Sequence, residues 1–408
     1  MPKVVVVGAG AAGMATARKL DQLGLDPVVV EARARLGGRT WSETLANGHV
    51  AERGGEYFHS GTTEVHELVA ELGLHMTPQG FDPSDRMVTD PDGPSLAELE
   101  EGAKVVTEHW ASLGDEISDD TSIFDVFSGA PVDPVIRAAI VARISSGMAT
   151  HVRRVSARFS SNDWALVSHE NNTRIAEGNQ SLAERMADEL GRHRVRTRWP
   201  VSAVRQVGNG YEVANVHGEV IAADAVVIAV PVSILDRIEI DLSEATRTAV
   251  DKIGFGQATK LHLIVEGDLE PTVKQDVATP FSTWATQGIG MDGASFVTGF
   301  GSTHETQDTF QFRDRGARLF RPALEAAWEG TKFSGDELFT YWGGDPWARG
   351  SYSFRPTGWT DVDEAALAAP HEGVFFAGEH TADLHRGSIC GALRSGYRAA
   401  GEVAERLA

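Results

Sequence analysis

The sequence contains a single cysteine, Cys390, among its 408 residues. This count excludes an internal disulfide and a cysteine-ligated metal cluster. The 14 histidines are scattered and form no His-Glu-x-x-His pattern, so we expect no metal site. A chain so poor in cysteine is typical of a reducing compartment, and we therefore expect a cytoplasmic protein.

Long hydrophobic runs are also missing. The longest are Val4–Val7 and Ala225–Val230, which have the length of strands, whereas a membrane-spanning helix needs roughly 18 apolar residues. The apolar N-terminus is interrupted by glycines from Gly8 onward, so we expect no cleaved signal peptide.

Positive charge is in deficit, with a formal net charge of −21 at pH 7. This balance argues against nucleic acid or an anionic membrane as the main partner, because both require basic patches. An acidic protein would attract a cationic substrate, although solubility alone is the simpler explanation of the charge. With 408 residues, of which 42% are hydrophobic, the chain is expected to fold as two globular domains.

The N-terminal segment predicts a β-α-β unit. Lys3–Val7 is a Val-rich run typical of a buried strand, and a helical stretch extends from about Ala11 to Leu23. Gly24 is a natural helix stop, and Asp26–Val30 resembles a second strand. A short crossover of this kind is the unit of a parallel sheet.

Periodicity and turn residues predict further elements along the chain. Phe81–Pro94 is rich in Pro and Asp and is typical of a loop. The predicted helices are Leu96–Leu113, Pro134–Met148, Ser181–Leu190, more than one helix within Arg313–Trp328, and Ile389–Leu407. The predicted strands are Val195–Val204 paired with Gly210–Val216, Ala225–Val230, Ala258–Val265, Ser295–Phe300 and Gly373–Ala377.

The turn between the first strand and helix has the spacing Gly-x-Gly-x-x-Gly. Gly8 permits the tight turn, Gly10 lets the backbone approach a pyrophosphate, and Gly13 lets the helix pack close to the strand. Glu31 ends the second strand, where a carboxylate accepts hydrogen bonds from ribose hydroxyls. The alternative is a glycine turn unrelated to nucleotides. The whole pattern favours a dinucleotide site and disfavours NADP, but it does not choose between FAD and NAD.

The segment that follows, Arg33–Thr40, has a Gly-Gly pair flanked by arginines, which suits a second approach to phosphate. Here the chain resembles the flavin amine oxidase family, which includes monoamine oxidases, polyamine oxidases, L-amino acid oxidases and lysine-specific histone demethylases. The resemblance implies that FAD is the cofactor. It also implies that Arg33 and Arg39 contact phosphate, the alternative being that they are surface charges.

Further motifs extend this resemblance to the C-terminal part of the chain. Glu52–Tyr57 is similar to the segment that approaches the flavin ring, and Phe375–Ala382 with Gly387–Gly396 is similar to the second FAD motif. A helix starting near Ser388 would direct its positive end toward the flavin. The cofactor residues implied in this way are Gly8, Gly10, Ala11, Ala12, Gly13, Glu31, Ala32, Arg33, Gly37, Gly38, Arg39, Gly54, Gly55, Glu56, Val201, Ala229, Trp342, Tyr352, Gly378, Glu379, Gly387, Ser388 and Ile389.

The stretch Trp342–Phe354 resembles the segment that lines the substrate side of the flavin. Some monoamine oxidases have a cysteine that bonds to the flavin at the position of Ser351, so the serine predicts noncovalent FAD. Tyr352 and Trp342 would be aromatic walls around the amine, unless they serve ordinary packing. Monoamine oxidases place a second tyrosine at the position of Ser388, so this chain is more similar to the polyamine oxidase and histone demethylase branch.

Lys260 resembles the family lysine that holds a water against the flavin N5, and it is the third catalytic candidate. A strand lysine is otherwise most often a surface residue. Weaker candidates are Glu170, His59 and Arg349. Glu170 could pair with the distal ammonium of a diamine, and Arg349 with a substrate carboxylate.

The resemblance implies an α/β fold in which a Rossmann-like FAD-binding domain of discontinuous segments joins a mixed α+β substrate-binding domain. We expect 1–75, 173–237 and 341–408 in the first domain and 76–172 and 238–340 in the second.

The expected reaction is oxidation of a primary or secondary amine, bulky or polyamine-like amines included, to an imine, with dioxygen reduced to hydrogen peroxide. The alternatives are an L-amino acid oxidase, a flavin-dependent desaturase, isomerase or dehydrogenase, and a non-catalytic FAD-bound interaction protein. The partners expected are a small amine and dioxygen, without nucleic acid or membrane, and a homodimer is left open.

Overall fold

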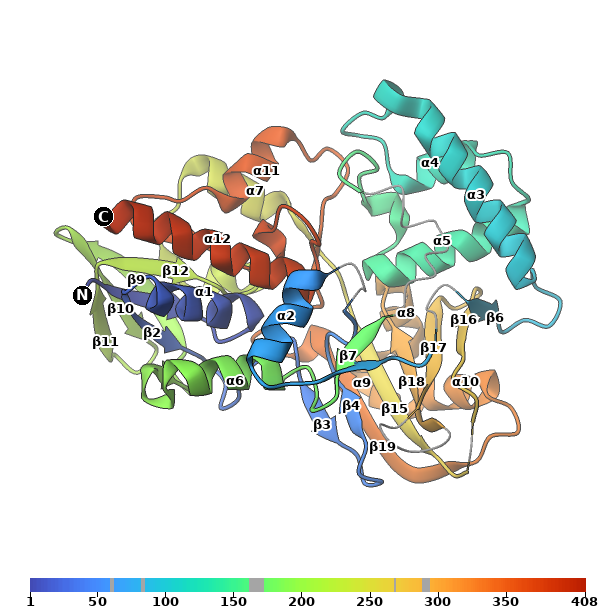
Figure 1. Ribbon diagram of the computed structural model, residues 1–408. Helices are drawn as coiled ribbons and strands as arrows, with labels where there is room; N and C mark the ends of the chain where they lie inside the picture. The colour runs from blue at the N-terminus through green and yellow to red at the C-terminus, as the bar shows by residue number, and fades with distance from the viewer. Residues whose placement is uncertain (59–61, 82–84, 161–171, 268, 288–293) are drawn as a thin grey trace.

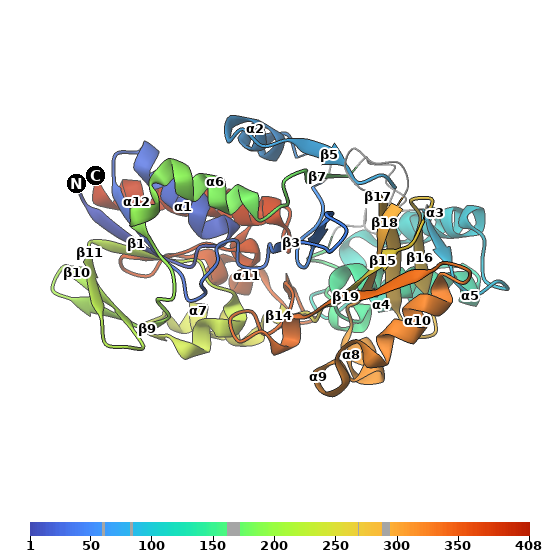
Figure 2. The same cartoon turned by 90° about the horizontal axis from the view of Figure 1, so that it is seen from below.

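The computed structural model describes residues 1–58, 62–81, 85–160, 172–267, 269–287 and 294–408. The molecule has two halves, each built around one main sheet, and the two chain termini lie side by side at one end (Figures 1 and 2). No helix within the described ranges is both long enough and apolar enough to span a bilayer.

The first half is built on a parallel sheet of five strands in the order β21-β12-β1-β2-β8. Alternate residues of β1 point to opposite faces. Val4 and Val6 belong to a core shared with α1, α6 and α12, whereas Val5 and Val7 pack toward the mixed sheet β11-β10-β9-β13. The bounds are β1 Lys3–Val7, β2 Asp26–Val30, β8 Val195–Arg196, β12 Ala225–Ile228, β21 Val374–Phe376, α1 Ala11–Gln22, α6 Ser181–Leu190, α12 Ile389–Leu407, β9 Val201–Val207, β10 Gly210–Asn215, β11 Val220–Ala223 and β13 Glu239–Ile240.

One predicted strand of this half is wrong. Val195–Val204 is divided between β8, which pairs with β2, and β9, which pairs with β10. Between them Arg198 takes a φ of +56°, which breaks an extended backbone, and Pro200 has no N–H to donate to a ladder. The chain therefore passes from one sheet to the other at this point.

The second half contains a mixed sheet of six strands in the order β19-β15-β18-β17-β16-β6. Helices α8, α9 and α10 cover one face through an aromatic-rich core, and α5 contacts the sheet through Ser146, whose hydroxyl lies 3.0 Å from that of Ser282 on β17. The bounds are β6 Arg86–Val88, β15 Thr259–Val265, β16 Val273–Asp276, β17 Phe281–Gln287, β18 Ala294–Gly301, β19 Phe333–Tyr341, α3 Leu96–Leu113, α4 Ile123–Gly129, α5 Pro134–Met148, α8 His304–Phe310, α9 Phe312–Arg315 and α10 Phe320–Ala327.

The helices expected within Arg313–Trp328 are α9 and α10, and Gly316 takes a φ of +56° between them. One prediction in this half is corrected. The predicted loop Phe81–Pro94 contains β6, which adds a parallel edge strand to the sheet by pairing with β16. A three-residue edge strand has too little periodicity to be recognised from sequence.

Smaller elements connect the halves. Residues 239–252 lie with the first half, since β13 pairs with β9 and Ala249 of α7 shares a core with Leu367 of α11. The structure therefore places the point where the chain passes from the first half to the second beyond Lys252, later than the predicted boundary at 238.

The α/β class with a Rossmann-like parallel sheet is confirmed. The connecting elements are α2 Thr63–Glu71, α7 Glu244–Lys252, α11 Asp361–Ala368 and the strand pairs β3 Ser42–Thr44 with β4 Val50–Glu52, β5 Met76–Pro78 with β7 Thr173–Ile175, and β14 Gly254–Phe255 with β20 Ser353–Phe354.

Candidate active site

A cavity of about 990 Å³ extends from the carboxyl ends of β1 and β2 to β15 and α5. It therefore draws its walls from both halves of the molecule. Every predicted cofactor or catalytic residue except Gly13 lines it, namely Gly8, Gly10, Ala11, Ala12, Glu31, Ala32, Arg33, Gly37, Gly38, Arg39, Gly54, Gly55, Glu56, Val201, Ala229, Lys260, Trp342, Tyr352, Gly378, Glu379, Gly387, Ser388 and Ile389.

The glycine turn before α1 forms one end of the cavity. Gly8 takes a φ of +107°, a conformation that costs glycine little. A Cβ on Gly13 would lie 1.9 Å from the carbonyl oxygen of Gly8, so Gly13 serves the packing of helix on turn. Gly10 offers no side-chain cap, which leaves the N–H groups of the first turn, at Ala11 and Ala12, without intrahelical partners. The result is a helix N-terminus suited to an anion.

Glu31 is a buried carboxylate fixed by the turn that it faces. One oxygen accepts a 2.9 Å hydrogen bond from the Ala9 N–H, and the other accepts a 2.8 Å bond from the Arg33 N–H. An ionised carboxylate has about four lone-pair sites. Two acceptor positions are therefore left for hydroxyl donors.

Arg33 and Arg39 line the cavity, but protein groups already contact both guanidinium groups. Arg33 pairs with Asp345. Arg39 donates to the carbonyl oxygen of Ser351 at 2.6 Å and to the carboxylate of Glu379 at 2.8 Å. Each arginine thus cross-links the N-terminal segment to a C-terminal one, and the phosphate contact stays a prediction.

Glu379 is the acceptor at the centre of the C-terminal motif. Its carboxylate accepts bonds from Arg39, from the Ser353 hydroxyl at 2.7 Å and from the Gly387 N–H at 3.2 Å. Burial alone would raise the pKa of this carboxyl, but the charge of Arg39 and these donors hold it below its usual value. Glu379 is therefore an anion that ties three cavity segments together.

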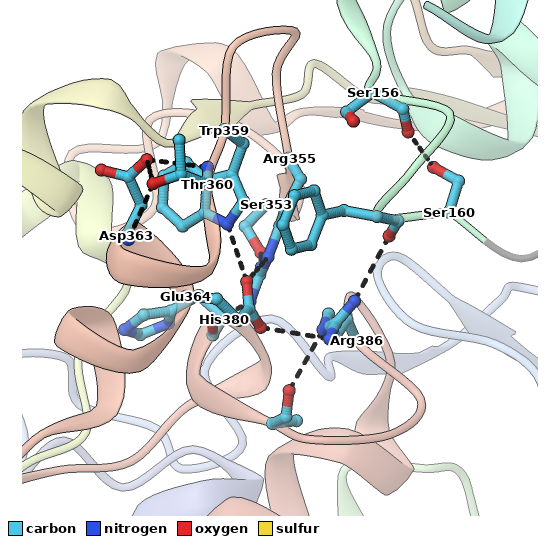
Figure 3. A network of polar contacts seen from close by, with 12 residues as sticks. Ser156, Ser160, Ser353, Arg355, Trp359, Thr360, Asp363, Glu364, His380 and Arg386 are labelled. Atoms are coloured by element: carbon cyan, nitrogen blue, oxygen red, sulfur yellow. Dashed lines mark hydrogen bonds and ion pairs between the residues drawn. The ribbon is translucent and has the colours of Figure 1, made fainter. Parts of the chain in front are cut away.

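A partly buried network of polar contacts packs against this motif (Figure 3). Arg355 makes two bonds to Glu364, at 2.7 and 2.8 Å, and donates to the carbonyl oxygen of His380 at 2.9 Å. The indole N–H of Trp359 donates to Glu364 at 2.8 Å, and Arg386 pairs with the same carboxylate at 3.1 Å. The network fixes the loops on both sides of Glu379.

Helix α12 begins at the cavity wall. Its bounds agree with the predicted Ile389–Leu407, and Ser388 caps it by accepting a 3.1 Å bond from the Gly391 N–H. Ser388 and Ile389 both line the cavity. The positive end of the helix dipole therefore lies at this wall.

Lys260 lies on β15 with only 5% of its surface exposed. Its ammonium donates to the carbonyl oxygens of Glu52 and Gly54 at 2.9 and 2.8 Å, and to the Glu56 carboxylate at 2.6 Å. A lysine ammonium has three donors, and protein atoms accept all three. A water bound by Lys260, as the resemblance implies, would have to replace one of these partners.

Two aromatic residues form walls near Lys260. Trp342 donates its indole N–H to the carbonyl oxygen of Arg53 at 2.8 Å and meets Trp41 edge-on, with ring centroids 6.4 Å apart. Tyr352 donates its hydroxyl to the carbonyl oxygen of Gly147 at 2.5 Å. Both rings line the cavity and are held in place by backbone acceptors.

Ser351 also lines the cavity, and its hydroxyl is buried with no hydrogen-bond partner among the described residues. The thiol of Cys390 is buried and does not line the cavity, and burial raises its pKa. Neither position supplies a reactive thiolate to the cavity.

Sequence reasoning missed several lining residues. Tyr57 ends the motif Glu52–Tyr57 but was not assigned a role of its own. Arg86, Arg143, Trp284 and Phe300 come from segments where the resemblance is weak, and nothing in their local sequence marks them. Other lining residues that were missed are Trp199, Ile234 and Arg237.

Of the weaker candidates, only Arg349 lies in the described part of the chain, and it does not join this site. Arg349 pairs with Asp236 at 3.0 Å and is absent from the cavity lining. Glu170 and His59 lie outside the described residues. In the part of the chain that is described, no three His, Cys, Asp or Glu side chains gather as a metal site would require.

The profile of the family described as flavin containing amine oxidoreductase matches residues 11–404. The chain belongs to this family. The resemblance inferred from the glycine and arginine motifs is thereby confirmed, and a flavin is the cofactor that this membership implies.

Relatives and solved structures add detail. Lysine-specific histone demethylase 1B of Mus musculus is 26% identical over 98% of this chain, which spans about half (52%) of that relative's length. Putrescine oxidase of Kocuria rosea is 28% identical over 77% of this chain and 70% of the relative. Cyclohexylamine oxidase from Brevibacterium oxydans IH-35A has the same fold, with a TM-score of 0.84 and 22% identity over 100% of this chain and 99% of that chain.

Proposed function

We propose that this chain is an FAD-dependent amine oxidase that holds its FAD noncovalently. The observation that supports this most is the continuity of one cavity, which joins the uncapped N-terminus of α1 to Lys260, Trp342 and Tyr352. Family membership supplies the flavin, and relatives named for the oxidation of putrescine and cyclohexylamine supply the class of substrate.

The lining residues fit an extended dinucleotide. The uncapped first turn of α1 suits a pyrophosphate, and the two remaining acceptor positions of Glu31 suit ribose hydroxyls. The Gly54–Gly55 backbone and the start of α12 would bracket the flavin ring. Ser351 cannot form a thioether, which supports noncovalent binding.

When bound, FAD supplies the chemistry of accepting a hydride from the amine carbon and passing the electrons to dioxygen, which yields hydrogen peroxide. The chain supplies position and exclusion of water. Tyr352 and Trp342 would orient the amine nitrogen between their rings, and the hydrogen bonds that fix them limit reorientation. Water then hydrolyses the imine.

A second candidate is oxidation of an amino acid. Such a substrate requires a cation for its carboxylate, and Arg86 and Arg143 are among the arginines outside the FAD motifs that line the cavity. Burial lowers the pKa of Arg86, yet an arginine remains charged at neutral pH. These two residues keep an L-amino acid oxidase open beside the amine oxidase.

A panel of substrates tests both candidates. Primary, secondary and diamine substrates and L-amino acids are mixed with the flavin-loaded chain without oxygen, and loss of flavin absorbance is followed. Peroxide release is then measured in air. Bleaching by amines supports the main proposal, bleaching by amino acids alone supports the second, and no bleaching by either class contradicts both.

A further inference from the structure

Three side-chain donors converge on Glu56, a cavity residue with 6% of its surface exposed. The Lys260 ammonium donates to Oε2 at 2.6 Å. The amide N–H of Gln79 and the indole N–H of Trp284 each donate to Oε1 at 3.0 Å. Both carboxylate oxygens of Glu56 therefore face protein donors.

Three donors directed at the two oxygens suit an ionised carboxylate, which carries acceptors alone. The indole N–H of Trp284 can only donate, so it requires an acceptor at Oε1. The environment of Glu56 therefore matches a carboxylate anion.

Lys260 is the matching cation. Its three partners are two carbonyl oxygens and the Glu56 carboxylate, and three acceptors match the three N–H donors of an ammonium. The ammonium also lies 5.6 Å from the centroid of the Trp284 ring. A buried charge without its partner would be costly, and here each charge stabilises the other.

We propose that Glu56 is a positioning residue that cancels the charge of Lys260, so that the two form a neutral pair in the wall of the flavin site. The proposal rests on the proposed function, because it takes the flavin ring to lie beside Gly54–Glu56. The flavin then experiences the field of a dipole rather than that of a full cation.

The flavin midpoint potential tests this charge balance. Glu56→Gln leaves the ammonium unbalanced and is expected to raise the potential, because reduction adds negative charge that a cation stabilises. Lys260→Met leaves the carboxylate unbalanced and is expected to lower it at alkaline pH, where the acid stays ionised. The double variant is expected to return close to the wild-type value. Shifts of the same sign in both single variants, or no shift, overturn the proposal.

A matched control uses a second lysine–carboxylate pair of the same chain. Lys252 donates to Asp363 at 2.5 Å, and neither residue lines the cavity. Lys252→Met removes the same cation outside the flavin site and is expected to leave the potential unchanged. A shift in this control as large as that of Lys260→Met would mean that the measurement responds to any lost charge.

Thermal unfolding of the full chain gives a readout that does not depend on catalysis. Each single variant is expected to unfold at a lower temperature than the wild type, and the double variant no lower than the worse single one, since coupled partners are non-additive. Additive losses would overturn the pairing.

The proposed function and the present inference fail in different ways. If the wild-type chain takes up no flavin, or if no amine bleaches the bound flavin, the proposed function fails. If an amine bleaches the flavin but the midpoint potentials do not shift as expected, only the present inference fails.

Discussion

The hydroxyl of Tyr352 donates a 2.5 Å hydrogen bond to the carbonyl oxygen of Gly147. Gly147 lies near the end of α5, in the half that contains the six-stranded sheet, whereas Tyr352 directly precedes β20. Both residues line the cavity. The bond therefore joins two walls that come from segments about 200 residues apart in the chain.

Replacement of Tyr352 separates the role of its hydroxyl from that of its ring. Tyr352→Phe leaves the Gly147 carbonyl without this partner, which costs about 1–3 kcal/mol of stability, but it keeps the aromatic wall. We expect kcat/KM with the preferred amine to fall by less than about tenfold, the equivalent of about 1.4 kcal/mol. Tyr352→Ala removes the aromatic wall as well, and we expect its kcat/KM to fall much further. Equal losses of kcat/KM in the two variants would contradict an orienting role for the ring.

Glu31 is expected to control retention of the flavin. Glu31→Gln keeps one acceptor oxygen but turns an N–H toward one of the two backbone donors at Ala9 and Arg33. We expect flavin affinity to drop at least about tenfold, or about 1.4 kcal/mol. The measurement is the ratio of flavin to protein absorbance after gel filtration. Glu212→Gln, an exposed change on β10, is the control and should retain flavin as the wild type does.

Gly13 is expected to act on stability through packing alone. A Cβ at this position would lie 1.9 Å from a backbone oxygen that cannot rotate away, and overpacking of this kind costs about 1–3 kcal/mol. Gly401 is also inside a helix but has nothing within 4 Å of the corresponding position. Gly401→Ala is therefore expected to stabilise the chain by about 0.5–1 kcal/mol. Denaturant unfolding measures the free energy of unfolding of both variants. A Gly13→Ala variant as stable as Gly401→Ala would contradict the prediction.

Glu52 is expected to make stability fall with rising pH. Burial raises the pKa of this carboxyl to about 7 from an ordinary value of 4.5. Between these values the folded state holds a proton that the unfolded state has released. The stabilisation is complete below the unfolded pKa and is lost as pH rises through 7, with a slope of up to about 1.4 kcal/mol per pH unit.

The comparison with Glu52→Gln isolates this contribution, because other groups titrate in the same range. The quantity to follow is the unfolding free energy of the wild type minus that of the variant. It should fall as the pH is raised from about 5 to about 8, an interval of about three units that includes the shifted pKa. A constant difference would show that Glu52 titrates at its ordinary value in the folded protein.

Local sequence carried much of the fold. The bounds of β1, β2, α5, α6 and α12 agree with their predictions, because each has a clear period and a clear stop. The strand Val195–Val204 failed, since it joins two stretches across Arg198, whose backbone conformation breaks the element. Propensity summed over a window does not register a single positive φ.

The site divides in the same way. Gly8, Gly10 and Glu31 could be assigned because their spacing within one β-α-β unit is itself the signal. The partners of Glu56 could not, since Lys260, Gln79 and Trp284 come from three separate segments that only the tertiary fold brings together. Arg86 was missed for the same reason, because its edge strand is recognised only by its pairing with β16.

The order of strands in the parallel sheet sets a condition on biosynthesis. β1 pairs with β12, and β12 pairs with β21 at Val374–Phe376, which is far from β1 along the chain. The entropy of closing so long a loop must be overcome before this pairing can form. The parallel sheet can therefore be completed only after β21 has been synthesised, long after β1 and the glycine turn that follows it.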